Sequence, residues 1–397
     1  PGACSASNAL TCSRDVPEMR RYLIVGMGAA AISAAEAIRT LDRAGDILLV
    51  SDDPHGYYSR PGLAYCLSNE VSERMLFPFR KEDFQHLPVS QDLYTSAGFE
   101  SPDGLHLLQA GIHNADILTT VSPTYAKEIQ TPEFGSGLDA LLRKREPDLF
   151  GVLNGMDYEV WNPETDLHIP ANYSHEDLGG KAVDKAALQE AMGLDVDPKV
   201  PVFAMISRLV DQKGFGQLCG PTHGSLWSIC DELDLQFVIL GTGDAWCEDE
   251  LATLAEKLPN LAVALEYNDP LAHLIEAGAD FFLMPSAYEP CGLSQMYSLR
   301  YGTLPIVRRT GGLADTVSSY DEKTGEGTGF VFEDLTPKAI ANSVGWAVWA
   351  WYNRPEDILA MRVRAMQQRF SWDASAARYV ELYRWAMDRR LGRTPRT

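Results

Sequence analysis

The chain has 397 residues, of which 45% are hydrophobic, and it carries a formal net charge of -21 at pH 7. This length is enough for two or three domains, and the composition is typical of a globular protein with a hydrophobic core. The negative charge argues against a nucleic-acid backbone or an anionic membrane as a partner. No apolar run approaches the ~20 residues that span a bilayer, so no membrane protein is predicted.

The first segment, residues 1–20, lacks the basic patch and apolar stretch of a secretory signal, and we interpret it as a disordered leader. The chain contains 7 cysteines, an odd number, and no Cys-x-x-Cys pair. A disulfide framework and a structural zinc site are therefore not expected, and no metal site is predicted. A reducing cytoplasm is the compartment that this cysteine content favours.

The segment over residues 21–53 has the pattern of a strand, a glycine turn, a helix and a second strand. The apolar run YLIV precedes the turn VGMGAA, the run AAISAAEAIRTL has helical periodicity, and DILLVSDD reads as the second strand. This pattern predicts one βαβ unit. Residues 54–100 are rich in Pro, Gly, Ser and aromatic residues, and we expect an irregular junction there.

From about Gly104 onwards, strands alternate with helices. A helix is predicted over residues 105–115, and the tail from Pro337 to Arg390 is predicted to be mostly helical. Strands are predicted over residues 117–122, 151–155, 200–207, 235–241, 261–267, 279–286 and 303–309. This alternation predicts an α/β fold with a Rossmann-like parallel sheet that helices cover on both faces.

The strongest candidate site lies in residues 279–317. A buried strand leads into a loop that holds Glu289, and the sequence Cys291–Leu293 then opens a helix. The next strand ends in two arginines, and Thr310–Gly312 opens another helix. Two helix N-termini therefore lie at the carboxyl edge of the predicted sheet, where free backbone N–H groups and the helix dipole bind phosphate.

Two further strand ends carry groups that suit the same ligand. Arg208 and Lys213 follow the strand VPVFAMI, and the turn with Gly241 and Gly243 follows the strand QFVIL. Any one of these features alone is more often a packing turn or a solvated charge. Together on one parallel sheet, they predict a site for a nucleoside diphosphate, in which two cations neutralise the phosphates.

These segments resemble bacterial glycogen synthases and starch synthases. The resemblance covers about residues 104–388, and it implies the C-terminal half and the inter-domain region of a glycosyltransferase of the GT-B type. The matching segments are ADILTTVSPTYAKEI, GVLNGMDYEVWNPETD, ISRLVDQKGF, ILGTGD, EPCGLSQMYSLRYGTLPIVRRTGGLADTV and FSWDASAARYVELY.

The resemblance implies a retaining enzyme that moves glucose from ADP-glucose or UDP-glucose to the non-reducing end of an α-1,4-glucan, with no cofactor required. It places the donor diphosphate on Arg208 and Lys213 and the donor sugar opposite Glu289, which are the predicted catalytic residues. A helix-capping role for Glu289 is compatible with this one. The predicted substrate-binding positions are Gly241, Gly243, Tyr267, Cys291, Gly292, Leu293, Thr310, Gly311 and Gly312.

The sequence departs from that family before Gly104, where no KTGGL-like turn is present. The resemblance places such a turn in an N-terminal domain that contacts the donor phosphates. We therefore expect weak or absent turnover by this chain alone, although donor binding by the second domain would survive.

Residues 20–87 instead resemble the start of flavin-dependent pyridine-nucleotide oxidoreductases. In that family Gly26 and Gly28 would approach the FAD pyrophosphate, and Asp52 would face the ribose. Residues 60 and 61, an Arg-Pro pair, match a further segment of that family. The resemblance stops after one βαβ unit, so FAD remains a minor alternative as a cofactor.

The sequence therefore leaves three hypotheses open. The chain is a glycogen or starch synthase-type glucosyltransferase, a fragment of a flavin oxidoreductase, or a non-catalytic module that binds nucleotide-sugar or glucan. The predicted domain organisation begins with a leader over residues 1–20 and a partial dinucleotide-binding unit with its junction over residues 21–100. Residues 101–150 are predicted to be a remnant of the GT-B N-terminal domain and the inter-domain region. A nucleotide-sugar-binding domain over residues 151–370 and a C-terminal helix over residues 371–397 that packs back across the cleft complete the prediction.

Overall fold

The computed structural model describes residues 21–25, 46–50, 100–101, 104–105, 107–220 and 224–392. The chain forms two compact units, residues 1–115 and residues 116–397. No helix among the described residues is both long enough and apolar enough to cross a membrane.

The described part of the first unit contains two short pairs of strands and a helix. Strands β1 (Arg21–Val25) and β2 (Asp46–Val50) are parallel neighbours, as a βαβ unit requires. Strands β3 (Glu100–Ser101) and β4 (Gly104–Leu105) form an antiparallel pair, and α4 (Leu107–Asn114) follows. The leader and the positions predicted to contact FAD, Gly26, Gly28 and Asp52, lie outside the described residues.

The second unit is built on a six-stranded parallel sheet with the strand order β12-β11-β10-β7-β8-β9. The chain enters the sheet in its middle at β7, runs to one edge, and returns to the other side of β7 with β10. Such a reversal is the topological switch point outside which ligands bind in open α/β sheets. The strands are β7 (Val202–Ile206), β8 (Gln236–Leu240), β9 (Leu261–Ala264), β10 (Phe281–Met284), β11 (Leu304–Arg308) and β12 (Phe330–Phe332).

The strands predicted from residue 200 to residue 309 are confirmed as β7 to β11. Strand β12 was not predicted because its three residues are too few to show a period, and its position is fixed by pairing with β11. The strand predicted over residues 151–155 is wrong beyond its first residue. The observed strand β6 (Leu149–Gly151) pairs with β5 (Leu118–Thr120) and ends at Gly151. The chain then turns away from β5, and Met156 forms an isolated bridge with Ser371.

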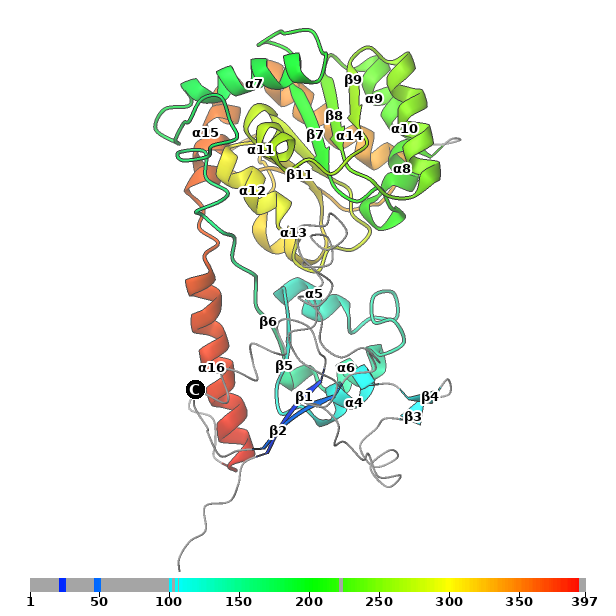
Figure 1. Ribbon diagram of the computed structural model, residues 1–397, viewed down its shortest axis with the longest axis vertical. Coiled ribbons are helices and arrows are strands. Elements are labelled where there is room, and N and C mark those ends of the chain that lie inside the picture. The colour runs from blue at the N-terminus through cyan, green and yellow to red at the C-terminus, as the bar shows by residue number, and fades with distance from the viewer. Residues whose placement is uncertain are drawn as a thin grey trace, which may run out of the picture. The chain divides into compact units, whose positions relative to one another are not determined.

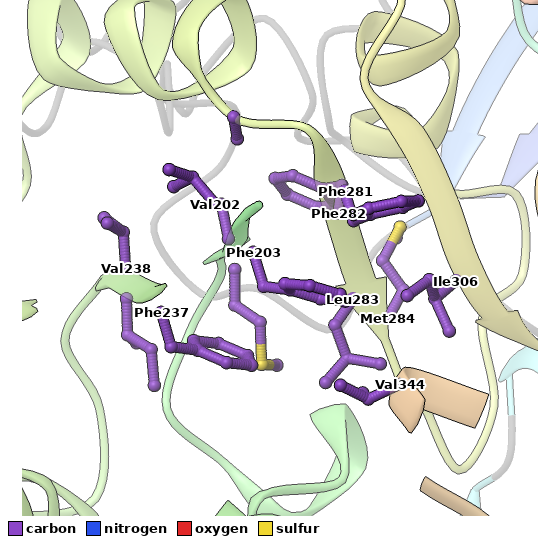
Figure 2. Packing of buried hydrophobic residues seen from close by; sticks show 14 of the residues in the cluster. Val202, Phe203, Phe237, Val238, Phe281, Phe282, Leu283, Met284, Ile306 and Val344 are labelled. Atoms are coloured by element: carbon purple, nitrogen blue, oxygen red, sulfur yellow. The ribbon is translucent and has the colours of Figure 1, made fainter. Parts of the chain in front are cut away.

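The core of the sheet is mainly apolar because both of its faces are covered. Figure 2 shows Phe203, Phe237 and Phe281 on the three central strands. Their rings stack, with centroids 6.2 Å apart between Phe203 and Phe237 and 4.7 Å apart between Phe203 and Phe281. Burial of a side chain of this size stabilises the fold by about 2 kcal/mol.

Helices cover the sheet in two groups (Figure 1). One group contains α7, α11, α12 and α15, and the other contains α8, α9, α10 and α14. The helices are α7 (Gly179–Ala191), α8 (Phe215–Cys219), α9 (Leu226–Glu232), α10 (Ala245–Lys257), α11 (Asp269–Gly278), α12 (Ser294–Tyr301), α13 (Gly311–Thr316), α14 (Pro337–Asn353) and α15 (Pro355–Gln367).

A smaller part of the second unit precedes this sheet. It contains β5, α5 (Pro123–Glu128), α6 (Asp139–Lys144) and β6. The C-terminal helix α16 (Trp372–Arg390) packs against it, with the ring of Trp385 edge-on to Phe150 at 5.4 Å. The Ser375 hydroxyl donates a hydrogen bond to the carbonyl of Leu153 at 2.6 Å. The last helix therefore returns to the segment ahead of the sheet.

Candidate functional site

The predicted site residues of the second unit lie in the loops that follow β7 to β11. Because parallel strands end at one edge of a sheet, these loops share the carboxyl edge. Arg208 and Lys213 follow β7, and Glu289 follows β10, so the three side chains flank the switch point from both sides.

Lys213 and Glu289 form an ion pair across the switch point. The Lys213 Nζ atom lies 2.5 Å from Oε2 of Glu289, and the side chains are 19% and 9% exposed. The Ser286 hydroxyl donates to the same carboxylate oxygen at 3.1 Å. Lys213 ends a short 3₁₀ turn, and the left-handed Gly214 that follows has no room for a Cβ, which would lie 2.2 Å from the carbonyl oxygen of Pro285. The loops after β7 and β10 are therefore packed together at the pair.

Arg208 is exposed beside this pair. Its NH2 group lies 3.3 Å from Oε1 of Gln212, and Nε2 of Gln212 donates to the carbonyl of Tyr288 at 3.2 Å. The backbone of Gln212 also accepts a hydrogen bond from the N–H of Ala287 at 2.8 Å. Gln212 thus connects the two loops and orients the guanidinium. The sequence analysis assigned no role to it, although it lies between the two predicted cations.

The turn after β8 is packed against the loop after β7. A Cβ on Gly241 would lie 1.9 Å from the carbonyl oxygen of Ser207, so only glycine fits there. Gly243 forms a bridge with Leu209, and its N–H donates to the Glu248 carboxylate at 2.8 Å. Tyr267, in the loop after β9, is 90% exposed. The glycine turn therefore lies beside Arg208, and Tyr267 extends into solvent.

The start of α13 is already bonded within the chain. The N–H of Gly311 and the hydroxyl of Thr310 donate to the carboxylate of Glu128, each within 3.2 Å. The N–H of Gly312 donates to the carbonyl of Glu289 at 3.0 Å. The N–H groups predicted to hold phosphate here thus have partners. The sequence analysis gave Glu128 no role, although it lies in the segment SPTYAKEI that carries the resemblance.

The start of α12 is different. Within the described part of the chain, no hydrogen bond engages the N–H of Gly292 or Leu293, and no side chain caps the helix. Cys291, just before them, is buried, and burial raises the pKa of its thiol, so the thiol stays protonated at neutral pH. Cys291 is therefore suited to a packing and backbone role, and the free N–H groups beside it suit an anion.

The arrangement brings together two cations, a buried carboxylate and an uncapped helix N-terminus at one sheet edge. Cations and aligned N–H groups stabilise phosphate oxygens. A carboxylate accepts hydrogen bonds from sugar hydroxyls. The chemistry that fits is binding of a phosphorylated sugar, with its anionic end on the cations and its hydroxyls near Glu289.

Comparison with known proteins gives two matching family models. Residues 70–144 match the starch synthase catalytic domain, and residues 191–353 match group 1 glycosyl transferases. The first match begins ahead of Gly104, the predicted start of the resemblance. Both models fall in the same class of enzyme.

Curated relatives extend the similarity over most of the chain. A glycogen synthase of Treponema denticola is 54% identical over 299 residues, which are 75% of this chain and 61% of that protein. Glycogen synthase 1 of Methylococcus capsulatus is 44% identical over 343 residues, which are 85% of this chain and 67% of that protein. The chain thus spans about three fifths to two thirds of the length of the curated relatives it matches.

Solved structures give the fold. The catalytic domain of starch synthase IV from Arabidopsis thaliana bound to ADP and acarbose has a TM-score of 0.69 and 29% identity, with 92% of this chain and 73% of that chain covered. The predicted fold class, a Rossmann-like parallel α/β sheet of the GT-B type, is confirmed by this similarity and by the strand order.

Proposed function

The chain belongs to the glycogen and starch synthase family, and on this premise we propose that it is a retaining glucosyltransferase. Its donor is ADP-glucose, and its acceptor is the non-reducing end of an α-1,4-glucan. The similarity to a solved starch synthase that carries ADP supports adenosine over uridine in the donor.

One observation carries the proposal: a cation and a carboxylate face each other across the switch point of the sheet. Lys213 and Glu289 are paired at 2.5 Å, and Arg208 lies beside them on the loop after β7. In this arrangement the diphosphate would lie on the two cations, with the sugar directed towards Glu289. The free N–H groups of Gly292 and Leu293 at the start of α12 suit the distal phosphate better than the start of α13, where Glu128 is already bound.

Charge stabilisation explains the chemistry. The bond between the anomeric carbon and the distal phosphate oxygen breaks, and its electron pair goes to the departing diphosphate. The acceptor hydroxyl oxygen forms the new bond to the anomeric carbon, and the proton of that hydroxyl passes to the departing diphosphate. Lys213 and Arg208 stabilise the charge that develops on the leaving group, and each fixed donor of this kind contributes on the order of 3 kcal/mol in other enzymes. Glu289 would orient the sugar hydroxyls and stabilise the positive charge at the anomeric carbon.

The direct test is release of ADP from ADP-glucose in the presence of glycogen. We expect slow release by the native protein, a large loss in Glu289→Ala, and no change in Lys257→Ala. Lys257 is exposed at the C-terminal end of α10, which leads to the amino edge of the sheet. Equal release by the native protein and Glu289→Ala would exclude the role of Glu289. A parallel series with UDP-glucose gives the nucleotide preference.

Calorimetric titration with ADP separates the glucosyltransferase from a binding module. Binding of ADP with no release of ADP from ADP-glucose at all, not even slow release, in protein that unfolds cooperatively, would favour a module that binds nucleotide-sugar. Absence of binding would exclude both. The flavin alternative has one observation in its favour, the parallel pairing of β1 with β2, and a yellow, flavin-loaded preparation would support it.

We also infer a reducing compartment such as the cytoplasm. Cys219, Cys230, Cys247 and Cys291 are free and buried, and the Sγ atoms of Cys219 and Cys247 lie 3.7 Å apart in a thiol–thiol hydrogen bond and form no disulfide. Thiol counting on denatured protein, purified under conditions that block exchange, tests this inference.

A further inference from the structure

Three potential metal ligands converge away from the proposed catalytic residues. His168, Asp269 and His273 each present one ligand atom, and the three atoms lie within 4.8 Å of one another. Asp269 and His273 are four residues apart on α11, so their side chains share one face of the helix. His168 comes from the loop between β6 and α7. His168 and Asp269 are exposed, which leaves the cluster accessible from solvent.

Asp166 positions both histidines. Its Oδ1 atom accepts a hydrogen bond from the backbone N–H of His168 at 2.8 Å, and its Oδ2 atom lies 2.7 Å from Nδ1 of His273. The hydroxyl of Tyr301 also donates to Oδ2, at 2.5 Å. The carboxylate can only accept from the imidazole, so in the neutral ring of His273 the proton is on Nδ1 and Nε2 holds a free lone pair. Histidines that bind metals nearly always donate their other ring N–H to such a carboxylate or carbonyl.

The Nε2 atom of His273 is buried without a hydrogen-bond partner among the described residues. His273 is only 1% exposed. Buried polar atoms in proteins are paired in the great majority of cases. The ring is held by Trp161, which stacks on it with centroids 3.9 Å apart and planes 8° apart. A fixed imidazole with a buried free lone pair beside a second imidazole and a carboxylate has the form of a metal ligand.

We propose that His168, Asp269 and His273 bind a divalent transition-metal ion, with Zn²⁺ as the best fit. Two imidazoles and one carboxylate match the ligand preference of Zn²⁺ and not that of Mg²⁺ or Ca²⁺, which prefer oxygen. The ion clamps the loop that holds His168 to the start of α11. It serves the stability of the second unit, because the loops that carry Arg208, Lys213 and Glu289 contain none of its ligands.

The test compares Zn²⁺ binding by the full chain and by variants of its exposed ligands. Protein stripped with a chelator and dialysed is titrated with ZnCl₂ against a chromophoric chelator, and its thermal unfolding is followed with and without Zn²⁺. We expect one equivalent of tightly bound Zn²⁺ in the native protein. His168→Ala and Asp269→Asn should bind at least tenfold more weakly and lose the stabilisation by Zn²⁺.

His175→Ala is the matched control, because His175 lies outside the cluster. It should bind Zn²⁺ as the native protein does. Equal Zn²⁺ affinity and stabilisation in the native protein and His168→Ala would overturn the proposal, and so would an equal stabilisation by Mg²⁺. His273 would then be a packed core histidine, bonded to Asp166 and stacked on Trp161. Replacement of His273 itself is avoided, since its loss would disturb the packing against Trp161.

Discussion

The ammonium of Lys213 lies 2.5 Å from the carboxylate of Glu289, so these two opposite charges at the centre of the candidate site form an ion pair. The two residues come from loops after different strands, β7 and β10, that flank the switch point of the sheet. Donor binding would therefore add an anionic diphosphate next to a pair that is already neutral. The two partners should consequently respond to mutation in opposite directions.

Lys213→Ala should weaken ADP binding by tenfold or more, because it removes a cation and leaves Glu289 without a partner. Removal of one member of a buried pair commonly costs about 3 kcal/mol or more, and the partial exposure of this pair reduces that figure. Glu289→Gln should leave ADP affinity unchanged or slightly higher, because a negative charge near the phosphates is lost. Calorimetric titration with ADP measures both. Equal weakening in the two variants would mean that Glu289 acts only by positioning Lys213.

Arg208→Ala should weaken ADP binding by roughly tenfold at low salt, because an exposed guanidinium beside the diphosphate is lost. Exposed charges are screened at high ionic strength, so the difference from the native protein should shrink as salt is added. The control Lys257→Ala also removes one positive charge, at the C-terminal end of α10, which leads to the amino edge of the sheet. It should have no effect on the affinity for ADP. An Arg208→Ala protein with native affinity at low salt would place the diphosphate elsewhere.

Gly311→Ala and Gly345→Ala should change stability in opposite directions. Gly311 has φ +43°, and a Cβ there would lie 1.9 Å from the carbonyl oxygen of Glu289, whereas a Cβ on Gly345 in α14 meets nothing within 4 Å. The first substitution should destabilise the protein by about 2 kcal/mol and reduce turnover. The second should stabilise it by about 0.5–1 kcal/mol. Urea unfolding measures both changes in the free energy of unfolding. A Gly311→Ala variant as stable as the native protein would contradict the close packing of the Glu289 loop against the start of α13.

The sequence alone was enough to predict most of the sheet. Strands β7 to β11 lie in short, mainly apolar runs that alternate with helical segments, and this pattern can be read without knowledge of the fold. Strand β12 could not be predicted, because it is defined by its pairing with β11 and not by its own pattern. The proximity of Arg208, Lys213 and Glu289 could be predicted because all three follow strands that a parallel sheet brings to one edge, whereas their roles in catalysis stay a prediction.

The contacts that order the site could not be predicted in the same way. Glu128 reaches the start of α13 across 183 residues of sequence, and no local pattern indicates that pairing. Gln212 was visible between two predicted cations, but its bond to the carbonyl of Tyr288 depends on how the loops pack. The free N–H groups at the start of α12 and the bonded ones at α13 look alike in sequence. Only the structure distinguishes them.

Glu128→Ala should destabilise the second unit by about 1 kcal/mol without changing ADP affinity. Its carboxylate caps α13, and removal of a capping acceptor commonly costs this much. Glu128→Gln keeps an acceptor oxygen and should lose less. Unfolding in urea gives the stability, and titration with ADP gives the affinity. A higher ADP affinity in Glu128→Ala would mean that the diphosphate competes with Glu128 for α13, contrary to the preference for α12.

The expectation of weak turnover by this chain alone stays a prediction. Weak turnover of a folded protein can be distinguished from weak turnover caused by misfolding. If the donor loops are intact, ADP should bind and stabilise the protein against heat even when release of ADP from ADP-glucose is slow. A thermal shift with ADP, measured beside the glycogen assay, distinguishes an inactive but folded protein from a misfolded one. Turnover rates typical of enzymes, on the order of 10 s⁻¹, would contradict the expectation.

Glu276 should make the stability of the second unit fall as pH rises. It lies on α11, is only 1% exposed, and accepts a hydrogen bond from the Ser298 hydroxyl at 2.8 Å. Burial raises the pKa of its carboxyl from 4.5 to about 8. Below the ordinary pKa the folded and unfolded chains are both protonated. Between that value and about 8 the folded chain keeps a proton that the unfolded chain has lost, so the stabilisation present at low pH is lost across this window.

Glu276→Gln removes this proton but keeps an oxygen that can accept from Ser298. One proton taken up on folding corresponds to a slope of about 1.4 kcal/mol per pH unit, and the free energy of unfolding of the variant should fall less steeply by an amount of that order. Chemical unfolding at several values between about pH 5 and pH 8 measures the difference from the native protein. Glu256→Gln, an exposed carboxyl on α10, is the control and should keep the native slope. Parallel pH profiles for the native protein and Glu276→Gln would show that Glu276 is ionised in the folded chain.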